Sequence, residues 1–198
     1  AERALLAGVA PERTQITAQQ LPANLQALVD QGVRFNACSL HQLQQYCALY
    51  PGGEVSVRIN PGLGSGHSNR TNVGGPSSSF GIWHAHLDEV LSIAAEHNVK
   101  VTGMHTHIGS GADPEMWVHC AKLSLYIAER IEHVRVLSLG GGFKVARMSD
   151  ETATDLQLVG ESVKRAFEEF FAPDSPGGFL WCYAADDPSE SSQEATEE

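Results

Sequence analysis

Short apolar runs alternate with longer amphipathic runs along most of this 198-residue chain. The run "EVSVRINP" (54–61) is rich in β-branched residues and contains a stopping proline, which is typical of a strand. Residues 86–98 instead carry apolar side chains at Leu87, Val90 and Ala94, the spacing of one face of a helix. Repeated units of strand and then helix predict parallel strands connected by helical crossovers.

The same two patterns predict the remaining elements. The predicted strands cover residues 14–18, 33–39, 54–61, 99–108, 134–139 and 178–184. The predicted helices cover residues 21–32, 40–53, 86–98, 115–131 and 155–171. An open doubly wound sheet and a (β/α)8 barrel both have this order of elements, and both place their sites after the strands. Because a closed barrel needs eight strands in about 250 residues, we expect a partial α/β barrel with roughly six of the eight strands.

Composition argues against several classes of function. The formal net charge is −11 and the basic residues are scattered, so the chain lacks the basic patch of a nucleic-acid-binding protein. No apolar run approaches the roughly 20 residues that span a bilayer, and residues 1–10 do not have the pattern of a signal peptide. The four cysteines lie far apart without a CxxC pair, which disfavours structural zinc and favours reduced thiols in a cytoplasmic protein.

The composition changes after residue 172. Residues 173–185 begin with the turn-rich sequence "PDSPGG" and contain the possible last strand, whereas residues 186–198 hold six acidic residues and no basic one. A segment with so little to bury is expected to be disordered. We therefore predict one barrel domain over residues 1–172, a turn with a possible strand over 173–185, and a disordered acidic tail over 186–198.

Two histidines end the strand predicted at 99–108. Alternate residues of a strand share a face, so His105 and His107 are predicted to point the same way. The sequence "GSG" follows at once; its glycines let backbone N–H groups approach an anion, and Ser110 adds a hydroxyl donor. The pair could form a two-histidine metal site, a platform beside a bound ring, or simply two satisfied core histidines.

Three consecutive glycines, Gly140, Gly141 and Gly142, follow the strand predicted at 134–139. Glycine loses more conformational entropy on folding than other residues, so three in a row make sense where a backbone wraps an oxyanion. In barrels, the loops after the late strands often bind phosphate. The sequence is neither a Walker loop nor GxGxxG, and a plain tight turn is the alternative.

The segment 59–83 is much longer than the roughly 2–6 residues of a usual strand-to-helix connection. Its many polar residues favour a lid or a binding loop, and an insertion without function is the alternative. Weaker candidates lie near the ends of two predicted strands. Asn36, Cys38 and Ser39 could line the same site. Arg58 and Asn60 share a strand face, where Arg58 could be a buried partner for a carboxylate.

Three stretches together resemble one family. "VSVRINPGLGSGHSNRTNVGGPSSSFGIW" (55–83), "VTGMHTHIGSG" (101–111) and "VLSLGGGF" (136–143) are similar to the bacterial diaminopimelate decarboxylases. The likeness runs from about residue 1 to residue 171. That family uses pyridoxal 5′-phosphate and shares the alanine-racemase-type (β/α)8 barrel with ornithine decarboxylase. The resemblance therefore implies this type of barrel, with the C-terminal β-domain of the family absent from the chain.

The resemblance also implies roles for the histidines and the glycine loops. His107 matches the family histidine that stacks on the pyridine ring of the cofactor, and Ser110 matches a phosphate contact. Residues 140–142 match the loop that holds the phosphate, and His105 would lie close by. These roles agree with the platform and the anion-binding turns expected from the residues themselves.

The implied reaction converts meso-diaminopimelate to L-lysine and CO2, a step of lysine biosynthesis, in an enzyme whose full-length form is a homodimer. Part of that machinery is missing from the sequence. None of the four lysines, Lys100, Lys122, Lys144 and Lys164, has the context of the family's Schiff-base lysine. No "EPGR" motif supplies the acidic partner of the pyridine nitrogen. The chain alone is therefore expected to be inactive.

Two other functions stay open. A non-catalytic relative would keep the barrel for binding or regulation. A metal-dependent barrel hydrolase would use His105 and His107 as ligands. That class needs further ligands at other strand ends, where Ser39, Asn60 and Ser138 stand instead.

Overall fold

The computed structural model describes residues 7–17, 20–63, 78–109 and 113–172. The chain divides into two compact units. The first unit contains residues 1–60, 79–106 and 131–138, and the second contains residues 61–78, 107–130 and 139–198. The last predicted strand (178–184) and the acidic tail (186–198) lie outside the described residues, so both stay predictions.

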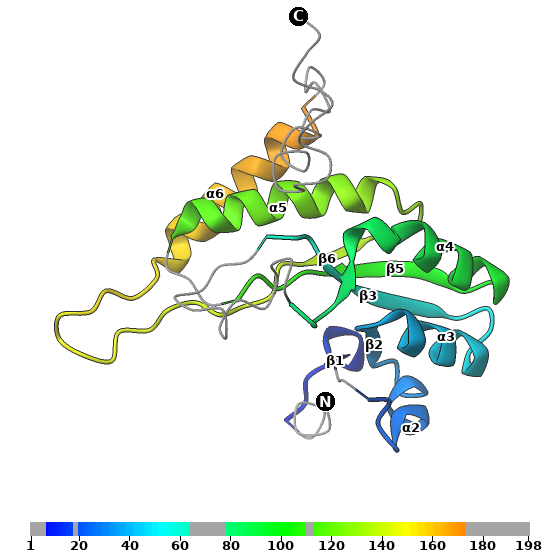
Figure 1. The fold of residues 1–198 in the computed structure, drawn as a ribbon. Helices are drawn as coiled ribbons and strands as arrows, with labels where there is room; N and C mark the ends of the chain where they lie inside the picture. Colours follow the sequence, from blue (N-terminus) through cyan, green and yellow to red (C-terminus); the bar gives the residue numbers. More distant parts are fainter. Residues whose placement is uncertain (1–6, 18–19, 64–77, 110–112, 173–198) are drawn as a thin grey trace, which may run out of the picture. The chain divides into compact units, whose positions relative to one another are not determined.

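One parallel sheet organises the first unit (Figure 1). Its strands are β1 (Gln15–Thr17), β2 (Arg34–Ala37), β3 (Glu54–Asn60), β4 (Ile82–Trp83), β5 (Lys100–His105) and β6 (Val136–Ser138). They lie in the order β1-β2-β3-β5-β6, every paired neighbour is parallel, and β4 pairs with β3 outside this row. Parallel strands in this order, with a helix between most of them, confirm the predicted partial α/β barrel.

Helices connect the strands of the first unit. They are α2 (Leu25–Val29), α3 (Leu40–Leu49) and α4 (Leu87–Glu96), with short 3-10 turns η1 (Pro11–Arg13) and η2 (His84–His86). Helix α3 begins after Ser39, whose side chain accepts a hydrogen bond from the backbone N–H of Gln42. It packs against α4 on one side. The rings of Phe35 and Tyr46 stack with their centroids 4.9 Å apart, which joins α3 to one face of β2.

Strand β3 is buried on both faces, but only one of them is apolar. All residues from Val55 to Asn60 are buried. Because strand residues alternate, the side chains form an apolar face and a polar face: Val55, Val57 and Ile59 against Ser56, Arg58 and Asn60. Strands of parallel sheets are usually apolar on both faces. Three buried polar side chains on one face therefore point to a function for that face.

The pairing of β3 with β5 leaves no room for a side chain at Gly103. The register shifts between Val55 and Ser56, so that Val55 lies opposite Val101 while Ser56 lies opposite Gly103. A Cβ atom on residue 103 would lie 2.2 Å from Ser56 Oγ. The serine side chain thus occupies the space that any larger residue at 103 would need, which explains a glycine inside this strand.

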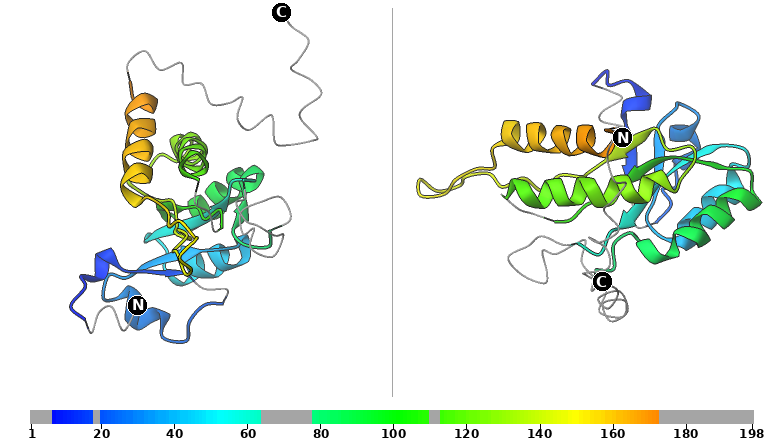
Figure 2. Two further views of the ribbon diagram at one scale, coloured as in Figure 1. Left: turned by 90° about the vertical axis from the view of Figure 1, so that its left-hand side faces the viewer. Right: turned by 90° about the horizontal axis from the view of Figure 1, so that it is seen from above.

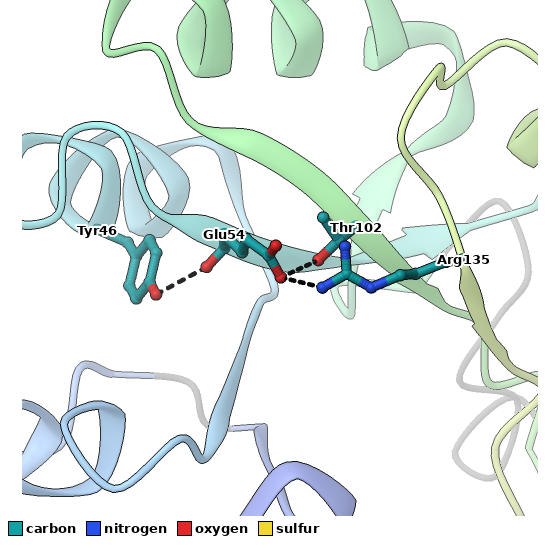
Figure 3. A network of polar contacts seen from close by, with 4 residues as sticks. All are labelled: Tyr46, Glu54, Thr102 and Arg135. Carbon is teal, nitrogen blue, oxygen red and sulfur yellow. Dashed lines mark hydrogen bonds and ion pairs between the residues drawn. The ribbon is translucent and has the colours of Figure 1, made fainter.

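A polar network joins the amino ends of β3 and β5 to the segment before β6 (Figure 3). The Glu54 carboxylate accepts hydrogen bonds from the Arg135 guanidinium and, at 3.3 Å, from the Thr102 hydroxyl. The hydrogen bond from Arg135 is the main cause that lowers the pKa of Glu54 below its ordinary value. The Tyr46 hydroxyl donates to the backbone carbonyl of Glu54 at 2.9 Å, and burial raises the pKa of Tyr46 to about 12.

Two helices, α5 (Pro114–Glu129) and α6 (Leu156–Phe170), pack side by side in the second unit (Figures 1 and 2). Asp113 and Asp155 cap them, because each carboxylate accepts a hydrogen bond from a backbone N–H of the first turn. Buried residues of this unit form one apolar cluster: Ile108, Trp117, Cys120 and Val159.

The described elements follow the predicted order but are often shorter. Five of the six predicted strands and all five predicted helices are present. The strand predicted at 99–108 ends at His105, and the helix predicted at 21–32 covers only Leu25–Val29. Strand β4 was not predicted, because two residues are too few to show an alternating pattern. No described helix combines the length and the apolar content that crossing a bilayer requires.

Replacing Gly103 with alanine should destabilise the fold, because the new methyl group would overlap Ser56 Oγ. Adding volume to a well-packed site costs about 1–3 kcal/mol, and urea unfolding should show a loss of that size. Gly160→Ala is the matched control, because a Cβ atom there meets nothing within 4 Å. The double variant Gly103→Ala, Ser56→Gly should recover part of the loss. If it recovers nothing, the serine is not the obstacle.

Neutralising Glu54 should weaken the folded state modestly at neutral pH. The Glu54 side chain is 50% exposed, so Glu54→Gln should lower the free energy of unfolding by no more than about 1 kcal/mol. Because the folded pKa is lowered, this stabilisation is complete above the ordinary value of 4.5 and is lost as the pH falls through the folded pKa. Urea unfolding of the unsubstituted chain and of Glu54→Gln over a series of pH values should show that the difference between their free energies of unfolding vanishes in acid. If Glu54→Gln lowers the free energy of unfolding by the same amount in an Arg135→Gln background, the ion pair is not the source of the stabilisation.

Candidate functional site

Three polar side chains lie near the carboxyl ends of neighbouring strands in the first unit. Asn36 is the penultimate residue of β2 and is fully buried. Arg58 of β3 pairs in register with His105, the last residue of β5. Parallel α/β folds place their binding and catalytic groups at this end of the strands. The carboxyl ends of β2, β3 and β5 are therefore a candidate site within the first unit.

Arg58 is a buried cation beside a thiol and an aromatic ring. Its side chain is 8% exposed, and burial lowers the pKa of the guanidinium, although arginine stays charged in proteins. The Cys38 thiol lies beside it, and its central carbon lies 5.4 Å from the ring centroid of Phe80. Within the described ranges, no carboxylate forms an ion pair with it. A buried guanidinium in this setting can bind an anionic group of a ligand.

His105 is held by an amide from a strand that is not its neighbour. Nδ2 of Asn36 lies 3.5 Å from Nδ1 of His105 and 3.1 Å from Oγ1 of Thr17. The His105 side chain is half-buried. Three strands, β1, β2 and β5, thus contribute to one chain of polar contacts at this end of the sheet.

His107 lies in the second unit, two residues beyond the end of β5. It is half-buried, and the backbone N–H of Gly141 donates a hydrogen bond to its Nδ1 over 3.3 Å. The glycine segment therefore holds one edge of the His107 ring. In a neutral imidazole, this contact leaves the proton on Nε2.

Two of the three glycines in the glycine segment have left-handed backbone. Gly140 and Gly142 have φ angles of 73° and 93°, in the left-handed region that disfavours other residues. Gly141 lies between them outside this region, and a Cβ atom built on it would meet nothing within 4 Å. Alternation between left-handed and right-handed backbone can turn neighbouring N–H groups toward an anion. In this structure the N–H of Gly141 donates to His107, so the anion donors of the segment would be its other N–H groups.

Some expectations for the site stay predictions. Ser110 lies outside the described residues, and so does its proposed phosphate contact. Strand β5 ends at His105, so the alternation of strand residues no longer gives an orientation for His107. Among the described residues, no group of three or more His, Cys, Asp or Glu side chains could hold a metal ion. The metal-site interpretation of the two histidines therefore gains no support.

A cavity of about 240 Å³ lies elsewhere in the first unit, at the amino ends of β2 and β3. Its lining includes Arg34, Glu54 and Thr102, and two of these already bond to each other. This is the opposite end of the strands from Asn36 and His105. Because α/β barrels carry their chemistry at the carboxyl ends, we do not assign the site to this cavity.

Most of the chain is similar to known decarboxylases. Residues 1–179 match the family described as pyridoxal-dependent decarboxylase, pyridoxal binding domain. The chain is 39% identical to a diaminopimelate decarboxylase of Streptomyces coelicolor over 150 residues, which cover 73% of this chain and 34% of that protein. It is 34% identical to the diaminopimelate decarboxylase of Escherichia coli K12 over 165 residues, which cover 79% of this chain and 39% of that protein.

Solved structures show the same similarity. A crystal structure of diaminopimelate decarboxylase aligns with a TM-score of 0.74 and 32% identity, over 84% of this chain and 41% of that one. The Helicobacter pylori enzyme complexed with L-lysine aligns with a TM-score of 0.74 over 84% of this chain and 45% of that one; at 22% identity it supports the fold alone. The chain thus spans between 34% and 45% of the length of these relatives.

Alanine substitutions in the glycine segment should separate the positions that need glycine from the one that does not. Gly140→Ala and Gly142→Ala each place a side chain in the left-handed region, which should cost about 1–2 kcal/mol of unfolding free energy. Gly141→Ala should be neutral or stabilising by up to about 1 kcal/mol, because the alanine restricts only the unfolded chain. Urea unfolding of the three variants provides the comparison. Equal losses at all three positions would contradict the described backbone.

Proposed function

This chain belongs to the pyridoxal-dependent decarboxylases, and from that premise we propose that it forms the cofactor-binding part of an enzyme that converts meso-diaminopimelate to L-lysine and CO2. The similarity to two diaminopimelate decarboxylases supports the choice of substrate. The observation that carries the proposal is the hydrogen bond from Gly141 to His107. It joins the two motifs that the resemblance assigns to the cofactor ring and the cofactor phosphate.

The described residues fit a ring that bears a phosphate. Gly140 and Gly142 have left-handed backbone, which can turn nearby N–H groups toward an anion, and a Cβ atom built on Gly141 would meet nothing within 4 Å. An imidazole held at one edge, as His107 is, can serve as a platform for an aromatic ring. Ser110 would add a hydroxyl donor to the phosphate, as the resemblance implies.

The chain's own residues bind and orient, while the cofactor carries the reaction. When bound, pyridoxal phosphate supplies the electron sink for the electron pair that remains when CO2 leaves the substrate. His107 would fix the plane of the ring, and residues 140–142 would hold the phosphate. In the first unit, Arg58 and His105 supply a buried cation and an imidazole that can hold an anionic group of a ligand.

None of the lysines in this chain suits the Schiff-base role. Lys122 and Lys164 lie on helices, where their Nζ atoms pair with Glu169 at 3.5 Å and with Glu168 at 3.6 Å. Lys100 begins β5, about 17 Å of strand away from His105 at the other end. Lys144 follows the glycine segment, at what the proposal makes the phosphate end of the cofactor. We infer that the reactive amine comes from outside this sequence.

A non-catalytic role for the domain is the second candidate, because the sequence lacks a suitable lysine. The relatives support the enzyme instead, since those compared above are named as decarboxylases. A cytoplasmic location agrees with the cysteines, because Cys38, Cys47 and Cys120 form no disulfide in the described part of the chain. Burial raises the pKa of Cys47 to about 11, which keeps that thiol unreactive at neutral pH.

Pyridoxal phosphate should bind this chain saturably through its phosphate and ring. His107→Ala should raise the Kd about tenfold, because it removes the ring platform and the partner of Gly141. His86→Ala is the matched control, since His86 is exposed and pairs only with its helix neighbour Glu89 among the contacts described for it. Calorimetric titration gives both values, and inorganic phosphate should compete. Equal affinity in the two variants would remove His107 from the site.

The missing lysine can be tested on the same complex. Borohydride reduction followed by peptide mass mapping should find only sparse labelling spread over the lysines, with no release of CO2 from diaminopimelate. Stoichiometric labelling of one lysine together with CO2 release would overturn the inference that the reactive amine lies outside this sequence.

A further inference from the structure

Asn36 reaches the side chain of His105 across the strand between them. Asn36 belongs to β2 and His105 to β5, and β3 separates the two strands. The register places Asn36 opposite Ser56, and Ser56 opposite Gly103. Because residue 103 has no side chain, β5 places none beside Ser56 at this level of the polar face. The amide can therefore extend to His105, which lies two residues further along β5.

The contact is a hydrogen bond with a defined direction. Nδ2 of Asn36 carries two hydrogens and no lone pair to share, so a partner of this nitrogen must be an acceptor. One hydrogen goes to Oγ1 of Thr17 at 3.1 Å. The other faces Nδ1 of His105 at 3.5 Å. A ring nitrogen that accepts a hydrogen bond carries no proton, so the proton of the neutral ring lies on the other nitrogen.

The orientation of the amide follows from what each choice leaves unpaired. In the structure, Oδ1 of Asn36 is buried and has no hydrogen-bond partner among the described residues. An inverted amide would accept from Thr17 and from a proton on Nδ1 of His105. It would also leave both Nδ2 hydrogens buried without an acceptor. A single unpaired carbonyl oxygen is tolerated better than unpaired N–H groups, which favours the orientation observed.

We propose that Asn36 is a positioning residue that holds His105 as a neutral imidazole with its proton on Nε2. The fully buried amide gives one hydrogen to Thr17 and turns the other toward the histidine, so Nδ1 of His105 meets a donor. The direction of any hydrogen bond at the other ring nitrogen of His105 is then fixed as well. Nε2 of His105 donates and does not accept.

This direction defines the chemistry of the group that His105 meets. A donor at Nε2 suits an oxygen that carries negative charge, such as a carboxylate, phosphate or phenolate oxygen, and it repels an ammonium group. That step rests on the proposed function, because it takes the cofactor or an amino-acid substrate as the ligand. The tautomer itself depends only on Asn36 and the fold.

Nitrogen NMR of the full 198-residue chain, labelled with 15N in its histidine rings, tests the tautomer directly. Protonated and unprotonated ring nitrogens have widely separated chemical shifts, and His105→Gln identifies the signals by their loss. At a pH where the ring is neutral, Nδ1 of His105 should have the unprotonated shift and Nε2 the protonated one. A protonated Nδ1 in the unsubstituted chain would overturn the proposal without any variant.

Asn36→Asp gives the sharper comparison, because a carboxylate accepts and cannot donate. The proton of His105 should therefore move to Nδ1. Thr17→Val is the matched control. At an exposed position, it removes the hydroxyl that accepts the other hydrogen of the Asn36 amide, and it should leave the tautomer of His105 unchanged. An unchanged tautomer in a folded Asn36→Asp chain would overturn the proposal. If that variant does not fold, the spectrum of the unsubstituted chain decides alone.

Titration with pyridoxal phosphate tests the proposed function independently of the tautomer of His105. If the ligand accepts from Nε2, Asn36→Asp should raise its Kd about tenfold, and Thr17→Val should not. A switched tautomer with an unchanged Kd would remove His105 from the ligand contacts. Failure of the unsubstituted chain to bind pyridoxal phosphate would overturn the proposed function, while the NMR result would still decide the role of Asn36.

Discussion

The pairing of β3 with β5 decides where the polar side chains of the first unit lie. The register shift after Val55 places Ser56 against Gly103 and Arg58 against His105. Without that shift, each residue of β5 beyond it would present its side chain to the opposite face, because the side-chain period of a strand is two. The missing side chain at Gly103 makes the shift sterically possible. One glycine thus controls both the packing of the central strands and the composition of the site.

The order of the elements could be predicted because it depends on local patterns. The strand predicted at 54–61 is β3 within one residue, and the helix predicted at 115–131 is α5 within two. Ends were predicted less well, since helix α2 covers only Leu25–Val29 of the predicted 21–32. Short elements such as β4 form by pairing with a strand that is distant in the sequence, and a local sequence pattern does not reveal this pairing.

The site could be predicted only in part for a related reason. Glycine runs and paired histidines stand out in a sequence, so His107 and Gly141 were both expected to matter, and their hydrogen bond is consistent with this. The contact between Asn36 and His105 joins residues 69 positions apart and depends on a register shift that no local pattern reveals. A polar residue between apolar neighbours near a strand end, as Asn36 is, was the only signal available.

Burial of Arg58 couples the folding of the first unit to the anions in its surroundings. Its guanidinium gives up water on folding and meets a thiol and an aromatic ring, while no described carboxylate pairs with it. An anion that binds there would bind the folded chain and not the unfolded one, so the free energy of unfolding would rise with the logarithm of its concentration above the Kd. Where such a ligand is scarce, a larger fraction of the chain would be open to proteases. The supply of the ligand would then regulate the abundance of the protein as well as its occupancy.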